Sequence, residues 1–292
     1  MPRMNRRTFI GNSVAATVAA SRLSWAAETV HKIDRIGMQL YTVRDAMKVD
    51  FDGTLAKVVA IGYREVEFAG YFGHAPKDVR AMLDKHKLVS PSEHVPYADV
   101  QDKWQQTLDA AHVVGQKYVV CPSIDEKQRN EPGGWKRAFE LFNRAGEASQ
   151  KAAIQFAYHN HTFEFEPSVE LGGKLPYDVM LAETDPKLVK MEMDLCWITL
   201  GGQDPLTYFD KYPGRFPMVH VKDWTKGENG KMSEKEKQGH MTDVGAGAID
   251  WKRIFAQSNK AGIKHYFVEH DEPKSPFDSL RNSYKYLHDL RF

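Results

Sequence analysis

The sequence predicts a (β/α)₈ barrel, in which eight parallel strands close on themselves and a helix follows each strand. Three observations lead to this fold class. From Arg35 onward, short apolar runs alternate with amphipathic stretches along the whole chain. Eight such pairs fit into about 250 residues, which is the usual size of this fold. No glycine-rich phosphate loop follows the first strand, which argues against an open, doubly wound sheet.

Eight short apolar runs are predicted to be the strands. They are Ile36–Tyr41, Glu65–Phe68, Leu88–Glu93, Tyr118–Cys121, Ile154–His159, Leu188–Asp194, Met218–Val221 and Tyr266–Glu269.

The stretches between these runs have helical periodicity. In residues 51–63, Leu55, Val58 and Val59 recur at the spacing of one helix face. Residues 76–88, 100–115 and 248–262 repeat the pattern. Gly115 and Gly262 each stand shortly before the next strand, where a helix C-cap is expected.

The composition is that of an ordinary globular protein. Hydrophobic residues make up 42% of the chain, and 40 basic residues balance 39 acidic ones to a net charge of +1. No basic stripe indicates a nucleic-acid partner, and nothing after the N-terminus predicts a membrane span. The stretch from Lys226 to Gln238 mixes lysine and glutamate and is interpreted as a solvated loop. Cys121 and Cys196 are predicted to be buried thiols, with a disulfide as the alternative.

The first 27 residues are typical of a leader. Arg6 and Arg7 stand in "NRRTF", which resembles a twin-arginine signal, and a modest apolar stretch follows. Ser24-Trp25-Ala26 fits the small-x-small cleavage pattern. We therefore expect a signal peptide over residues 1–27, one barrel domain over residues 33–292, and a periplasmic or otherwise exported protein.

Polar side chains gather where the predicted strands end, which in such a barrel is the active-site face. Side chains alternate between the two faces of a strand. By this parity Val219 and Val221 face the helices. His220 and Lys222 then face inward, whereas His270 has the outward parity and is excluded as a ligand. The strand-end residues are Glu67, Glu93, His94, His159, His161, Glu164, Asp194, His220, Lys222, Glu269 and Asp271.

Carboxylates and imidazoles that converge in one barrel mouth are poorly solvated unless a cation lies between them. Mixed oxygen and nitrogen ligands suit one divalent ion, which could be Mn²⁺, Co²⁺, Zn²⁺ or Mg²⁺. The alternative is a polar mouth held together by ordinary ion pairs.

Several motifs together resemble one family. They are "IGMQLYTVRD", "GYREVEFAG", "YHNHTFEF", "EMDLCW", "VHVKD", "DVGAGAIDW" and "FVEHDEP". In this order and spacing they are similar to the xylose-isomerase-like barrels, the sugar phosphate isomerase/epimerase group that also contains endonuclease IV-type enzymes. The resemblance extends from Ile36 to the C-terminus.

The resemblance implies a metal site with four ligands, one from each of strands five to eight. Asp194, His220 and Glu269 match the last three, and His159 stands where the family usually has a glutamate. This departure puts two-glutamate epimerisation in doubt, and Glu164 or His161 could ligate instead. We expect Glu269, His159 and Lys222 to be catalytic. The substrate-binding candidates are Glu67, His94, His161 and Glu164.

These residues predict a metal-dependent sugar isomerase or epimerase that enolises a sugar or polyol next to a carbonyl group. The alternative is a lyase that eliminates the aglycone from 3-keto-glycosides, since both reactions begin with the same proton abstraction. Less favoured are an endonuclease IV-like phosphodiesterase and a non-catalytic carbohydrate-binding barrel. The expected partner is a small sugar or glycoside, and a homo-oligomer is left open.

Overall fold

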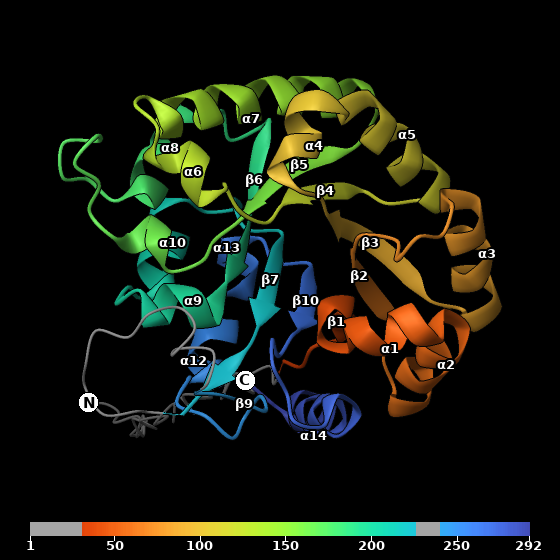
Figure 1. Ribbon diagram of the computed structural model, residues 1–292. Coiled ribbons are helices and arrows are strands. Elements are labelled where there is room, and N and C mark those ends of the chain that lie inside the picture. Colours follow the sequence, from red (N-terminus) through yellow and green to blue (C-terminus); the bar gives the residue numbers. More distant parts are fainter. Residues whose placement is uncertain (1–30, 226–239) are drawn as a thin grey trace, which may run out of the picture. The chain divides into compact units, whose positions relative to one another are not determined.

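Eight parallel strands close into a barrel in the computed structural model, which describes residues 31–225 and 240–292 (Figure 1). The strands follow the order β1-β10-β7-β6-β5-β4-β3-β2 around the barrel, so each strand lies beside its predecessor in the chain. Their bounds are β1 Gly37–Gln39, β2 Glu65–Ala69, β3 Val89–His94, β4 Tyr118–Cys121, β5 Gln155–His159, β6 Val189–Asp194, β7 Met218–Val221 and β10 His265–Val268. The predicted fold class is confirmed, and every predicted strand overlaps an observed one.

Helices cover the outside of the barrel (Figure 1). Their bounds are α1 Arg44–Val49, α2 Phe51–Ile61, α3 Pro76–His86, α4 Tyr97–Asp102, α5 Trp104–Val114, α6 Glu126–Asn130, α7 Gly134–Lys151, α8 Pro176–Glu183, α9 Leu195–Leu200, α10 Pro205–Lys211, α12 Trp251–Phe255, α13 Ser258–Ala261 and α14 Pro276–Asp289. Two 3₁₀ turns, η1 Leu40–Val43 and η2 Phe163–Phe165, follow β1 and β5. A small antiparallel ribbon, β8 Asp223–Trp224 with β9 Met241–Thr242, extends beyond β7.

Two predicted helices are each divided in the structure. Residues 100–115 are shared between α4 and α5, because Lys103 leaves the helical conformation at φ −133° and ψ 22°. The stretch 248–262 begins to be helical only at Trp251, where the Asp250 side chain accepts a hydrogen bond from the Arg253 amide, and it is then divided into α12 and α13. Gly115 and Gly262 are left-handed helix caps, as predicted.

The core has two layers because the strands alternate their side chains. Outward-facing residues such as Val66, Tyr158 and Val219 pack under the helices in the large apolar layer. Inside the barrel a small layer is made by Val120, Ala157, Met218 and Phe267. Gly37 makes room for this layer, since a β-carbon there would lie 2.8 Å from the Phe267 ring. The inward positions above it are polar, and they form the site described below.

Some of the other expectations from the sequence concern residues that the structure describes, and the rest concern residues that it does not describe. Cys121 and Cys196 are both buried and free, so the disulfide alternative is wrong. None of the described helices is long and apolar enough to cross a membrane. The predicted leader over residues 1–27 and the predicted loop Lys226–Gln238 lie outside the described residues.

The buried carboxylate of Asp223 organises the loop that follows β9. Its two oxygens accept hydrogen bonds from the backbone amides of Trp224, Gly245, Gly247 and Ile249 at 2.9–3.3 Å. The Trp251 indole donates a further bond at 3.0 Å. Gly247 must be a glycine here, because a β-carbon would lie 2.0 Å from Asp223 Oδ1. The motif "DVGAGAIDW" is therefore a loop that wraps around one carboxylate at the end of β7.

We expect Asp223→Asn to lower the free energy of unfolding by about 3 kcal/mol, because one acceptor oxygen and the charge that strengthens the remaining bonds are lost. Urea unfolding followed by circular dichroism measures this change. The control is Asp250→Asn, an exposed N-cap of α12, which should cost about 1 kcal/mol or less. Equal losses in the two variants would contradict the anchoring role.

Candidate active site

Four side chains converge where β5, β6, β7 and β10 end. His159 and Asp194 are the last residues of β5 and β6, His220 lies in β7, and Glu269 directly follows β10. Strand register brings them to one level, since Asp194 pairs with His220 and the Glu269 amide donates to the Val221 carbonyl at 3.2 Å. One ligand atom from each of the four lies within 4.8 Å of the others, and all four side chains are buried. The structure thus brings together the four residues that the sequence predicted as metal ligands.

Three nitrogen and oxygen atoms in this cluster, His159 Nε2, Asp194 Oδ2 and His220 Nδ1, are buried and have no hydrogen-bond partner among the described residues. His220 Nδ1 lies 2.7 Å from Glu269 Oε2, and His159 Nε2 lies 3.4 Å from Asp194 Oδ2, yet neither contact has the geometry of a hydrogen bond. Unpaired buried polar atoms are costly, so native proteins satisfy nearly all of them. Lone pairs aimed at a common point are satisfied by a cation, and the donor set fits a divalent metal.

The opposite edge of each ligand is held by the protein. Asp194 Oδ1 accepts hydrogen bonds from the Cys196 and Trp197 amides and so caps α9, which leaves Oδ2 for the centre. His159 Nδ1 faces the Pro122 carbonyl at 3.4 Å, so this nitrogen carries the proton and Nε2 keeps its lone pair. Burial lowers the pKa of His159 to about 4, and the imidazole is therefore neutral near pH 7.

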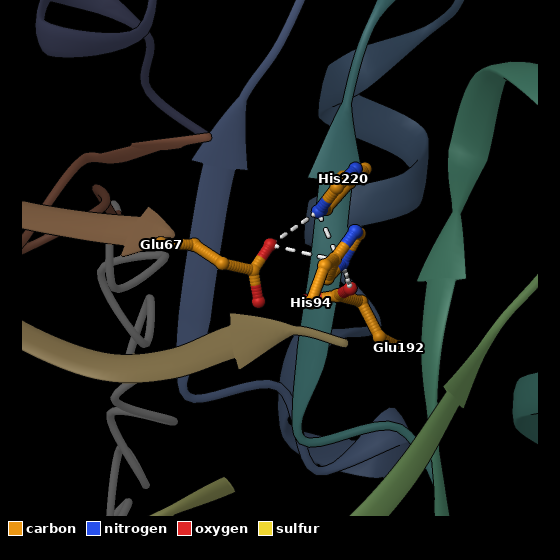
Figure 2. Close-up of side chains that lie close together, drawn as sticks. All are labelled: Glu67, His94, Glu192 and His220. Carbon is orange, nitrogen blue, oxygen red and sulfur yellow. Dashed lines mark hydrogen bonds and ion pairs between the residues drawn. The ribbon is translucent and has the colours of Figure 1, made fainter. Parts of the chain in front are cut away.

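A second polar group, formed by Glu67, His94, Glu192 and His220, lies directly against this centre (Figure 2). His220 Nε2 is 2.7 Å from Glu67 Oε2, and His94 Nε2 is 2.6 Å from Glu192 Oε2. Both contacts have hydrogen-bond geometry, unlike those in the first cluster. Although four ligand atoms are again close together, we therefore interpret this group as a hydrogen-bonded network.

The network determines which nitrogen of His220 is available. Nε2 is hydrogen-bonded to Glu67, so Nδ1 is the nitrogen that faces Asp194 and Glu269. Burial alone would lower the pKa of His220, but the carboxylates of Glu192 and Glu269 outweigh burial and raise it well above the usual range, so a metal would bind Nδ1 by displacing its proton. Glu67 is itself held by Gln39, whose amide nitrogen donates to Oε2 at 2.8 Å. The rings of His94 and His220 stack with centroids 5.1 Å apart. One imidazole thus links the centre to the network.

Lys222 supplies positive charge at the same level. Its ammonium lies 3.2 Å from Asp194 Oδ2, 2.8 Å from Glu269 Oε2 and 2.8 Å from Asp271 Oδ1. Burial alone would lower its pKa, but these carboxylates outweigh burial and raise the pKa well above the usual range. Burial likewise disfavours the ionised form of Asp194, yet Lys222 and His159 lower the pKa of this carboxyl to about 2.

His94 and His161 differ in charge. Burial would lower the pKa of His94, but the carboxylates of Glu67 and Glu192 overcome this effect and raise it. For His161, burial and the neighbouring His159 lower the pKa well below its usual range. His94 thus tends to be protonated, whereas His161 is a neutral imidazole.

A cavity of about 460 Å³ opens above the centre. Of the predicted site residues, five line it, namely His94, His159, His161, Lys222 and Glu269. Asp271 lines it as well. The position of these residues at the carboxyl ends of the strands is the usual active-site face of this barrel.

Two predicted substrate-binding residues, Glu164 and Glu67, do not line the cavity. Glu164 accepts hydrogen bonds from the Tyr158 hydroxyl at 2.6 Å and from the His161 amide at 2.8 Å, so it anchors the turn after β5. This geometry also argues against Glu164 as the first metal ligand. Glu67 lies below the centre as a partner of His220.

Glu192 and Gln39 belong to the site but were missed by sequence reasoning. Glu192 stands two residues before Asp194 on β6, so strand parity could have placed it inside the barrel. Gln39 ends β1, and its register partner is Glu67. Neither residue stands at the end of a predicted strand, where the candidates were sought.

Comparison with known proteins bears on this site. Residues 55–290 match the model of the xylose isomerase-like TIM barrel family. The chain belongs to this family. Family membership accounts for the barrel and for the polar mouth, and it confirms the resemblance drawn from the motifs.

Individual relatives indicate a sugar-modifying enzyme. The chain is 24% identical over 272 residues to an inosose dehydratase of Lacticaseibacillus casei, covering 82% of this chain and 89% of the relative. A solved sugar phosphate isomerase/epimerase from Parabacteroides distasonis has 27% identity and a TM-score of 0.71, covering 94% and 98% of the two chains. The IOLI protein, solved with a zinc atom, shares the fold at 13% identity and a TM-score of 0.68, covering 86% and 95%.

We expect Glu67→Ala to weaken binding of Zn²⁺ or Mn²⁺ about 10- to 100-fold, because the protein would no longer hold the His220 proton on Nε2. Glu67→Gln should weaken binding less, since its amide oxygen still accepts that proton. Titration calorimetry measures both constants. Glu65→Gln, an inward residue at the other end of β2, is the control. Unchanged affinity in Glu67→Ala would contradict this role.

Glu93 on β3 makes stability depend on pH. Burial raises its pKa from 4.5 to about 8, and a hydrogen bond with Tyr71 only partly opposes this. Between these values the folded protein retains a proton that the unfolded chain has lost, so this residue makes stability fall as pH rises. Glu93→Gln should therefore gain stability relative to the wild type between pH 5 and pH 8, by about 5 kcal/mol at most. Urea unfolding measures the gain, and exposed Glu126→Gln should show none.

Proposed function

We propose that the protein is a divalent-metal-dependent lyase that removes a proton next to the carbonyl group of a keto-sugar or keto-polyol and then expels a β-leaving group. The observation that carries this proposal is the convergence, beneath the cavity, of Glu269 and Lys222 with three buried ligand atoms that make no hydrogen bond among the described residues. Glu269, Lys222 and His159 are the residues that the sequence assigned to catalysis.

His159, Asp194, His220 and Glu269 would hold the metal. When bound, a divalent cation supplies Lewis-acid stabilisation of negative charge on a substrate oxygen. His159 has a single nitrogen available, because its Nδ1 faces the Pro122 carbonyl. It therefore serves as a metal ligand and not as the general base.

The residues that transfer protons are assigned from their positions and charges. Glu269 both belongs to the centre and lines the cavity, so it is the proposed base. Lys222 stays protonated among its carboxylates and donates a hydrogen bond to the substrate oxygen on which charge develops. His94 lines the cavity from β3, and its raised pKa suits it to protonate the departing oxygen.

Two observations favour elimination over epimerisation. The first ligand position carries His159 in place of a glutamate, which removes the second carboxylate that a two-base epimerase uses. The similarity to inosose dehydratases, whose name describes loss of water from a keto-polyol, also supports a lyase. The leader predicted for residues 1–27 would bring such an enzyme to extracellular glycosides.

An isomerase or epimerase is the second candidate. It is favoured by the 27% identity to the Parabacteroides distasonis protein across nearly the whole of both chains. It shares the first proton abstraction with the lyase, and it differs in returning the proton to carbon.

We expect solvent deuterium to enter, or a leaving group to be lost, when the protein is incubated in D₂O with Mn²⁺ or Co²⁺ and a panel of keto-inositols, keto-sugars and 3-keto-glycosides. Mass spectrometry follows both outcomes. Release of water or an aglycone supports the lyase, whereas exchange or epimer formation without release supports the isomerase or epimerase. Turnover without exchange and without a kinetic isotope effect at that carbon would refute enolisation.

Asp194→Asn provides the matching metal test. It should lose most of the bound metal and activity yet stay folded, because the amide oxygen can still cap α9. Asp204→Asn, which changes the N-cap of α10, should keep both metal and activity. Elemental analysis and circular dichroism give the two readouts. Full metal content in Asp194→Asn would overturn the assignment.

A further inference from the structure

The cavity has two chemically different sides. Residues that follow β5, β7 and β10 make one side polar and charged, namely His159, His161, Lys222, Glu269 and Asp271. The loops at the ends of β2, β3 and β4 make the other side more apolar, with Ala69, Gly70, Val95, Pro96, Tyr97 and Pro122 beside the polar residues His94, Ser123 and Asp125. The metal-ligand candidates in the lining, His159 and Glu269, both lie on the polar side, whereas His94, the proposed proton donor to the departing oxygen, ends β3 on the other side.

The apolar side has room for a group of its own. A volume of about 460 Å³ lies within the range of about 300–1,000 Å³ that holds drug-sized ligands, which leaves space beside a single sugar ring. Gly70 contributes to this space, because a β-carbon there would meet no heavy atom within 4 Å. Ala69 faces the barrel interior, as Glu65 and Glu67 do. The inward side chain at the end of β2 is therefore only a methyl group, which takes up little of the cavity.

The charge of the lining disfavours an anionic ligand. Lys222 is the one lysine or arginine among the described residues that line the cavity, and three carboxylates already surround it. Asp125, Glu269 and Asp271 add negative charge to the walls. His94, the other cationic side chain of the lining, is likewise ion-paired, with Glu192 at 2.6 Å. Away from the metal position, a phosphate or carboxylate group would therefore lose its hydration without gaining an unpaired cation.

Resting on the proposed lyase function, we infer that the apolar side binds the uncharged apolar aglycone of a glycoside whose keto-sugar ring lies on the polar side. The reaction is balanced without a co-reactant. Glu269 takes the proton from the carbon between the ketone and the glycosidic carbon, and that electron pair forms a carbon–carbon double bond. The glycosidic C–O bond breaks, and the aglycone leaves with the bonding pair and receives a proton.

Paired substrates test the subsite. The wild-type kcat/KM for a 4-nitrophenyl 3-keto-glucoside should exceed that for the methyl 3-keto-glucoside by about tenfold or more, and a 6-phosphorylated analogue should react far more slowly. Ala69→Phe fills the apolar side and should reduce the aryl-to-methyl ratio about tenfold. Val89→Phe adds the same ring at the exposed start of β3 and should leave the ratio unchanged.

Binding separates this inference from the lyase proposal. Calorimetry with unoxidised 4-nitrophenyl and methyl glucosides reports the subsite without turnover, and Ala69→Phe should remove the aryl preference. Equal affinity and equal kcat/KM for the two glycosides, or the same ratio in Ala69→Phe as in wild type, would overturn the subsite. If the aryl preference in binding is present but no keto compound exchanges deuterium or releases a group, the subsite stands and the lyase proposal fails.

Discussion

The rest of the site depends on the two contacts that the His220 imidazole makes, one through each ring nitrogen. One nitrogen lies 2.7 Å from Glu269 and faces the cavity side, and the other is hydrogen-bonded at 2.7 Å to Glu67 beneath it. A metal binds the neutral imidazole, which has one donor and one acceptor, so the proton that Glu67 holds on Nε2 makes Nδ1 the nitrogen that would bind the metal. If Glu67 were absent, the same ring could present a proton where a ligand atom is needed. The polar interior of the barrel is thus arranged around the tautomer of one side chain.

Barrel register makes this arrangement possible. Parallel strands bring Asp194 beside His220 and Glu192 beside Met218, so the two carboxylates of β6 lie at successive inward levels. The lower level forms the hydrogen-bonded network (Figure 2), and the upper level forms the candidate metal centre. The apolar layer that contains Met218 and Phe267 begins at the level of Glu192 and closes the barrel floor. Most of the buried charge inside the barrel thus lies at the end where substrate can enter, and Glu65, at the other end of β2, is paired with His265.

The charges of Lys222 and of the carboxylates around it fit the proposed chemistry. Asp194, Glu269 and Asp271 surround Lys222, and this keeps the ammonium protonated and the carboxyl of Asp194 ionised. Neutral His159 contributes a lone pair, because burial disfavours its protonated form. An anionic, partly desolvated pocket with converging lone pairs suits a divalent cation and a neutral substrate. The same charges that favour the cation work against phosphorylated ligands.

The sequence by itself determined the barrel, the order of its strands and the four residues of the centre. These follow from local periodicity, strand parity and motif resemblance, which are properties of neighbouring residues. The tertiary structure decided what depends on contacts between distant strands. In the structure, Glu164 is hydrogen-bonded to Tyr158 in the turn after β5, and Glu67 is hydrogen-bonded to His220 beneath the centre. Gln39 and Glu192 also belong to the site, through their hydrogen bonds to Glu67 and His94. A carboxylate at a strand end has the same local pattern whether it faces substrate or supports another side chain, and only its partners across the barrel distinguish the two roles.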